Sequence, residues 1–139
     1  MAAEPPRALE VATRALARRD FSERGLRERL RRSGISQADE DKTLRALQRA
    51  GIVDDSRFAR SRAQALAERG QGDAAIRFDL RRQGIAEDEI ETAVASLEPE
   101  RARAERVVAR RGAGAATARL LARRGFDEDA VEAAVAPDA

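Results

Sequence analysis

Three short stretches end in the same way: LRRSGI at residues 30–35, LRRQGI at residues 80–85 and LARRGF at residues 121–126. In each, a glycine follows helix-favouring residues and precedes a large apolar residue. A glycine in the left-handed conformation ends a helix, and the next residue then packs on the residue five positions before it. The arginines fall in the last turn, where cations offset the helix dipole. The sequence therefore predicts three glycine stops, built from Leu30, Gly34, Ile35, Leu80, Gly84, Ile85, Leu121, Gly125 and Phe126.

A helix start follows each stop. Ser36 and Asp127 are suited to capping a first helical turn, whereas Ala86 at the equivalent position is a weak cap. An apolar residue before the cap should pack on the fourth residue of the helix. That pairing is available in the second and third copies, but Glu40 occupies the position in the first copy.

The similarity between the copies continues without gaps, at offsets of about 50 and 41 residues, which is typical of helical repeats. A further helix precedes each matched pair, with Leu9 and Leu16 on one face in the first copy, and Phe58, Ala65 and Leu66 in the second. No stretch alternates β-branched and polar residues as a strand would. The sequence predicts an all-α fold: an elongated array of three tandem three-helix repeats at about 7–50, 54–97 and 100–136. These form one domain over residues 7–139, after a flexible N-terminal tail at residues 1–6.

The composition narrows the function. The 139 residues include 27 basic and 25 acidic residues, so the net charge is only +2, and 26 of the basic residues are arginine. No His or Cys is present, which excludes imidazole and thiolate catalysis and the usual zinc sites. The glycine doublets GQG (70–72) and GAG (112–114) lack the lysine of a phosphate loop and indicate turns or helix starts. We expect no enzyme activity, no cofactor and no metal.

The junction GIVDDSRFA at residues 51–59 is the most specific stretch, with Asp54 or Asp55 as a helix cap and Phe58 as the first buried anchor of the next helix. Together with FSERGLRERL (21–30), GQGDAAIRFDLRRQGI (70–85) and GAGAATARLLARRGF (112–126), it resembles the RecX family, the regulators of the bacterial RecA recombinase. The resemblance covers nearly all of residues 8–136. Gly25 departs from it, because family members usually have an acidic residue there, and a glycine inside a helix costs up to ~1 kcal/mol relative to alanine.

The arginines are the candidate binding residues. On the helix that contains Leu26 and Leu30, arginines lie opposite the apolar face, and the second copy repeats two of them. A solvated face with dipole-compensating helix ends is the simpler explanation of each one alone. As a group, on the extended surface of a repeat array, they could bind a partner. The candidates are Arg24, Arg27, Arg31, Arg32, Arg77, Arg81, Arg82, Arg103, Arg106, Arg110 and Arg123.

The resemblance implies that the chain binds along the groove of the RecA filament on DNA and modulates its ATPase and strand-exchange activity, usually by inhibition. The consequences would reach recombinational DNA repair and the SOS response. Several weak contacts along such a filament would reinforce one another. The alternative is a helical nucleic-acid-binding module that acts on DNA directly. No apolar run approaches a membrane span or a signal core, so we expect a monomer in the cytoplasm with no membrane partner.

Overall fold

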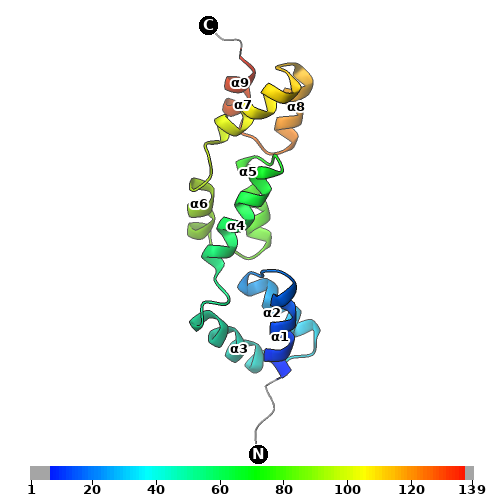
Figure 1. Cartoon of the computed structure of the whole chain (residues 1–139), viewed down its shortest axis with the longest axis vertical. Coiled ribbons are helices and arrows are strands. Elements are labelled where there is room, and N and C mark those ends of the chain that lie inside the picture. The colour runs from blue at the N-terminus through cyan, green and yellow to red at the C-terminus, as the bar shows by residue number, and fades with distance from the viewer. Residues whose placement is uncertain (1–6, 137–139) are drawn as a thin grey trace, which may run out of the picture. The chain divides into compact units, whose positions relative to one another are not determined.

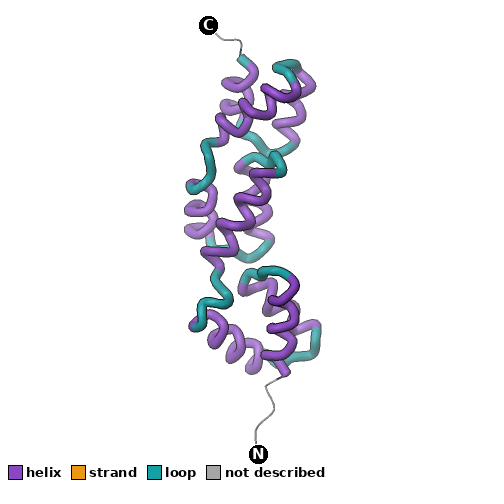
Figure 2. Tube along the Cα trace, in the orientation of Figure 1, coloured by secondary structure: helices purple, strands orange, loops and turns teal. Residues whose placement is uncertain are grey.

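The computed structural model describes residues 7–136 and is built from α-helices. This part of the chain contains no strand (Figure 2). The helices follow one another as three groups of three, which we call repeats 1, 2 and 3 (Figure 1). The predicted all-α fold of three tandem three-helix repeats is confirmed. The helices are α1 (Arg7–Arg18), α2 (Glu23–Arg32), α3 (Gln37–Arg49), α4 (Asp55–Glu68), α5 (Asp73–Arg82), α6 (Glu87–Ala95), α7 (Glu100–Arg111), α8 (Ala115–Arg123) and α9 (Glu128–Val135).

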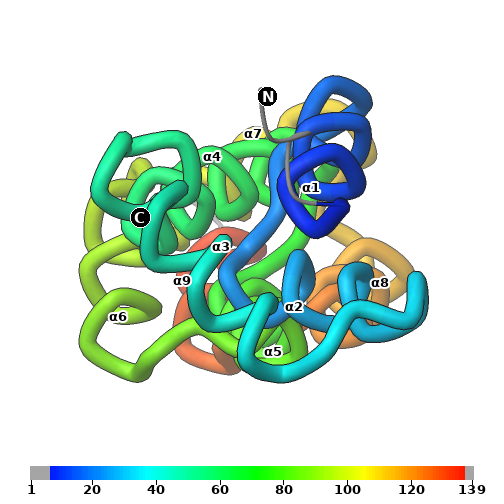
Figure 3. The backbone as a smooth tube through the Cα atoms, turned by 90° about the horizontal axis from the view of Figure 1, so that it is seen from below, coloured from blue at the N-terminus to red at the C-terminus, as the bar shows by residue number. Residues whose placement is uncertain are grey.

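The chain divides into two compact units between residues 58 and 59, in the first turn of α4. In the first unit, α1, α2 and α3 all contact one another; Figure 3 shows these helices from below. In the second unit, α5 packs on α6, and α7, α8 and α9 pack together. The predicted tail at residues 1–6 lies outside the described residues, and the single domain stays a prediction.

The three predicted glycine stops have the expected geometry. Gly34, Gly84 and Gly125 have φ angles of +81°, +80° and +87°. In the first stop, the amide of Ile35 donates to the carbonyl of Leu30 at 3.1 Å, and that of Gly34 donates to the carbonyl of Arg31 at 3.0 Å. The equivalent pair of bonds closes the other two stops. This pair of hydrogen bonds satisfies carbonyl groups of the last helical turn that have no partner within the helix, and it defines the Schellman ending.

The helix starts also follow the sequence. The hydroxyl of Ser36 accepts from the amide of Asp39 at 3.2 Å, and a carboxylate oxygen of Asp127 accepts from the amide of Asp129 at 3.1 Å. Ala86 makes no side-chain cap. At the junction, Asp54 is the cap of α4, because its carboxylate accepts from the amide of Arg57 at 3.1 Å. The two glycine doublets are turns that lead into the N-termini of α5 and α8, as predicted.

The middle helix of each repeat contains fully buried apolar residues. Leu26, Leu30, Ile76, Leu80 and Leu121 have no exposed surface. The remaining large apolar residues of the stops, with Phe58, are at most 8% exposed. Repeat 3 has a smaller core than repeat 1. The buried cluster of repeat 3 consists of Ala104, Leu121, Phe126 and Val131.

The buried face of the first helix in repeats 1 and 2 differs from the prediction. We expected Leu9 to lie on the buried face of α1, but it is 38% exposed, and the buried residues are Ala8, Ala12 and Ala15. In α4, Ala65 is exposed, whereas Ala59 and Ala63 are fully buried. Alanine lets neighbouring helices approach closely. The prediction chose the buried face by the more hydrophobic leucines and therefore overlooked the row of alanines.

Repeat 1 places a carboxylate in its core. Glu40 is 1% exposed, and its Oε1 lies 3.2 Å from Nη2 of Arg31 and 3.7 Å from Nη1 of Arg27. The expected apolar contact at this position is thus replaced by an ion pair. Gly25, the other departure in repeat 1, donates its amide to Oγ of Ser22 at 3.1 Å in the cap of α2.

Two glycines bring the backbones of repeats 2 and 3 into direct contact within the second unit. The amide of Gly72 donates to the carbonyl of Arg124 at 2.8 Å, and the amide of Ala74 donates to the carbonyl of Gly125 at 3.1 Å. A Cβ atom at Gly72 would lie 2.3 Å from the backbone nitrogen of Phe126. Glycine is therefore required at both positions by the close approach, and at Gly125 also by its positive φ angle.

Candidate functional site

The predicted arginines of α2 form ion pairs with the next helix. Arg27 donates to Asp41 on α3 at 2.5 Å and lies 3.5 Å from a carboxylate oxygen of Glu23. These carboxylates, Asp41 foremost, raise the pKa of the Arg27 guanidinium, against an opposing effect of burial. Arg31 reaches the buried Glu40. The positive charge on this face is therefore largely offset by acidic residues of the same repeat.

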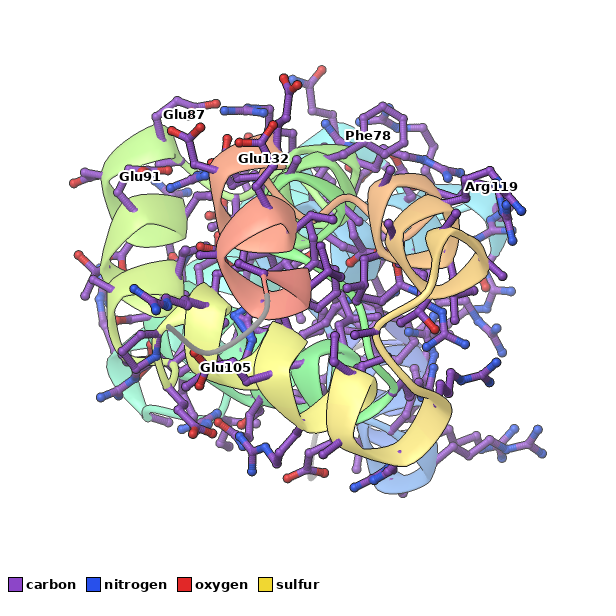
Figure 4. The ribbon with its side chains drawn as sticks, turned by 90° about the horizontal axis from the view of Figure 1, so that it is seen from above. Phe78, Glu87, Glu91, Glu105, Arg119 and Glu132 are labelled. Carbon is purple, nitrogen blue, oxygen red and sulfur yellow. The ribbon has the colours of Figure 1, made fainter. Side chains whose placement is uncertain are left out.

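Repeat 2 shows the same arrangement 50 residues later. Arg77 on α5 binds Glu91 on α6 through two bonds of 2.9 and 3.0 Å, matching Arg27 and Asp41 in repeat 1. Arg81 binds Glu87 in the same bidentate way, and the bond lowers the pKa of the Glu87 carboxyl. Glu87 and Glu91 are labelled on α6 in Figure 4.

Other predicted arginines have varied surroundings. Arg24 pairs with Glu28 on the same helix, and Arg106 pairs with Glu98. The guanidinium of Arg82 lies 5.9 Å from the ring of Phe78, a side chain that is 61% exposed and is labelled in Figure 4. The remaining three predicted residues are exposed and make no ion pair with any residue between 7 and 136; they are Arg32, Arg110 and Arg123.

Arg103, one of the candidate binding arginines, does not lie on an exposed face. Arg103 is only 7% exposed, and both of its terminal nitrogens donate to Oδ1 of Asp73, at 2.8 and 2.6 Å. Burial raises the pKa of the Asp73 carboxyl, and the charge of Arg103 opposes this shift. The partner comes from α5, 30 residues earlier, so periodicity along α7 alone could not reveal it.

Two acidic residues contact helix starts that the sequence did not assign to them. The carboxylate of Asp55, the first residue of α4, accepts from the amide of Glu23 at the start of α2 at 2.8 Å. Glu100, the first residue of α7, accepts from the amide of Asp73 at the start of α5 at 2.6 Å, and from the amide of Asp127 at 2.8 Å. In both places the first residue of one repeat caps the middle helix of the repeat before it. The only sign of these contacts in the sequence was an acidic residue at the start of α4 and of α7. An acidic residue at that place also stabilises the dipole of its own helix, so it did not indicate a contact with another helix.

Comparison with known proteins agrees with this architecture. A family model described as RecX, second three-helix domain, matches residues 54–94. The regulatory protein RecX of Syntrophotalea carbinolica is 42% identical over 93 residues, which cover 64% of this chain and 59% of that protein. Over this stretch the chain matches the RecX family. The regulatory protein RecX of Halorhodospira halophila is 35% identical over 89 residues, covering 64% of this chain and 55% of that protein.

The chain therefore spans a little more than half the length of these curated relatives. A crystal structure of RecX from Lactobacillus salivarius superimposes with a TM-score of 0.79 over 92% of both chains, at 16% identity, and shows the same fold. In residues 7–136 no helix is long and apolar enough to span a membrane, and no cluster of three acidic, His or Cys side chains could hold a metal ion.

Proposed function

We propose that this chain is a non-enzymatic regulator that binds RecA filaments and inhibits their ATPase and strand-exchange activity, acting in the cytoplasm on recombinational DNA repair and the SOS response. The observation that supports it is the match to several proteins named regulatory protein RecX, at 32–42% identity. The lack of His and Cys in the sequence supports a non-enzymatic role, because an activated nucleophile or a general base near neutral pH is hard to build without them.

The filament assay tests this proposal directly. Purified protein is added to RecA filaments formed on single-stranded DNA, and ATP hydrolysis and co-sedimentation with the filament are measured together. We expect the chain to sediment with the filament and the hydrolysis rate to fall with its concentration. Absence of sedimentation together with an unchanged rate refutes the proposal.

The ion pairs of α5 with α6 allow a sharper test of the predicted arginine face. If Arg77 and Arg81 contact the filament, each must exchange its glutamate for an acceptor on the partner. The variant Arg77→Ala, Arg81→Ala then weakens sedimentation. The variant Glu87→Gln, Glu91→Gln strengthens it, because the arginines are released. Equal behaviour of both variants and the wild type, with unchanged circular dichroism, places the contact elsewhere.

A further inference from the structure

The second unit contains a cavity of about 200 Å³ whose lining is rich in arginine. Arg69 lies just after α4, Arg110 and Arg111 are in the last turn of α7, and Arg124 follows α8. Glu68 is the acidic residue of the lining, so the formal charge around the cavity is +3 (four arginines and one glutamate). We call this cavity the arginine cleft.

These four arginines differ from the ones that the sequence singled out on α2 and α5. Arg27, Arg31, Arg77 and Arg81 each have a carboxylate within 3.2 Å. None of the arginine-cleft guanidiniums makes an ion pair with a carboxylate in the described part of the chain. Their charge is available to a ligand.

Compensation of helix dipoles does not account for the cluster. The C-terminal ends of three helices meet here, and each carries a partial charge of about −0.5, or about −1.5 together. The formal charge of +3 exceeds this. The backbone also holds one arginine in place. The backbone carbonyl of Arg124 accepts from the amide of Gly72. The side-chain Nη1 of Arg124 lies so close to Gly70 that a Cβ atom at residue 70 would be 2.7 Å from it.

A second cavity, of about 240 Å³, adjoins the arginine cleft. It shares Glu68, Gly70, Val107 and Arg110 with the arginine cleft and is also lined by Arg103. The Nε of Arg103 is the one buried side-chain nitrogen or oxygen between residues 7 and 136 that lacks a hydrogen-bond partner. A buried donor without an acceptor is unfavourable, so a residue of this neighbouring cavity has an unmet hydrogen bond.

The number of donors identifies the ligand chemistry. A carboxylate has two oxygens, and a single arginine binds it through both, as Arg77 does with Glu91. Four arginines that each bind through two N–H groups would offer eight donors, more than the roughly four lone pairs of one carboxylate. A phosphate group offers more acceptor oxygens and binds guanidinium groups bidentately. No aromatic residue lines the arginine cleft, so it provides no surface on which a base could stack.

We propose that the arginine cleft binds phosphate groups, independently of any RecA filament. The phosphates can come from the backbone of a nucleic-acid strand or from a small free phosphate compound. This site goes beyond the proposed regulatory function, and it is tested without RecA.

The test compares two variants of equal charge. The cleft variant carries Arg69→Ala, Arg110→Ala, Arg111→Ala and Arg124→Ala. The control removes four exposed arginines of the first unit that make no ion pair with the described residues, by Arg14→Ala, Arg18→Ala, Arg45→Ala and Arg49→Ala. Binding of a labelled single-stranded oligothymidine is followed by fluorescence anisotropy at several salt concentrations, and binding of pyrophosphate by calorimetry. Circular dichroism confirms that each variant is folded.

We expect the cleft variant to bind the oligonucleotide at least about ten-fold more weakly than the control does. The slope of log K against log salt should fall in magnitude by about 3, from four contacts at about 0.7 each for a single strand. Loss of pyrophosphate binding alone also supports the site and assigns it to free phosphates. Equal effects of the two variants, no binding of either ligand, or tighter binding of an oligoglutamate peptide overturns the proposal. If the cleft variant does not fold, two double variants are compared by the same criteria. The cleft is then tested by Arg110→Ala with Arg111→Ala, and the control is Arg45→Ala with Arg49→Ala.

Discussion

Replacing Glu40 with isoleucine should stabilise repeat 1, because repeat 2 has Ile90 at the matching position, fully buried. The Glu40 carboxylate is 1% exposed, and its nearest partner, Arg31, has a side chain that is 61% exposed. An ion pair with so exposed a partner contributes at most about 1 kcal/mol, whereas withdrawing the carboxylate from water costs several. The isoleucine side chain gains about 1.5–3 kcal/mol from burial.

Glu40→Ile leaves no buried charge alone. Arg27 keeps Asp41 and Glu23, and Arg31 reaches water. The burial of isoleucine and the relief of the desolvation cost together exceed the allowances of about 1 kcal/mol for the lost pair and about 1 kcal/mol for imperfect fit, so we expect a gain of about 2–4 kcal/mol. For a unit of this size each kcal/mol raises Tm by about 4–8 °C.

The measurement is a thermal and urea melt followed by far-ultraviolet circular dichroism. The matched control is the reverse exchange, Ile90→Glu, which buries a carboxylate in repeat 2 beside an Arg81 already bound to Glu87 and should cost more than about 3 kcal/mol. A loss of more than about 1 kcal/mol in Glu40→Ile, with a small effect of Ile90→Glu, would show that the buried ion pair is net stabilising and that our comparison of the two repeats is mistaken.

Three further predictions concern the second unit and the glycine stops. Asp73→Ala removes the oxygen that accepts from both terminal nitrogens of the buried Arg103 and should cost about 3–5 kcal/mol in a urea melt; a cost below about 1 kcal/mol contradicts the buried contact. Gly34→Ala should lower the free energy of unfolding by about 1–2 kcal/mol, because its backbone is left-handed. Gly125→Ala should lower it by at least about 2 kcal/mol more, because the added Cβ would lie 2.7 Å from the backbone nitrogen of Ala75. Equal losses in the two variants would refute the close approach. In a carboxyl NMR titration Asp73 should titrate above the usual pKa of an aspartate and Glu87 below that of a glutamate. As the pH falls through these values, protonation of Asp73 favours the folded state, whereas protonation of Glu87 removes the stability of its arginine bond.

The sequence was sufficient for features that depend on neighbours along the chain. A glycine stop involves six consecutive residues, and a helix cap involves three or four, so local pattern determined both. The residues that the sequence misassigned have partners far away in the chain. Arg103 meets Asp73 across 30 residues, and Asp55 caps α2 across 32. Periodicity on one helix cannot reveal such contacts, because the same spacing suits a solvent-facing arginine and one that a neighbouring helix neutralises.

The repeat alignment itself contains a test of which arginines are structural. Arg27 with Asp41 and Arg77 with Glu91 keep the same spacing, and each pair joins the second helix of a repeat to the third. In repeat 3 the acid is retained as Glu132, but Ala118 stands where the arginine would be. The repeated arginines of α2 and α5 thus each form an ion pair between helices. The arginines of the arginine cleft form no ion pair with the described residues, so they are the stronger candidates for contact with an anionic ligand.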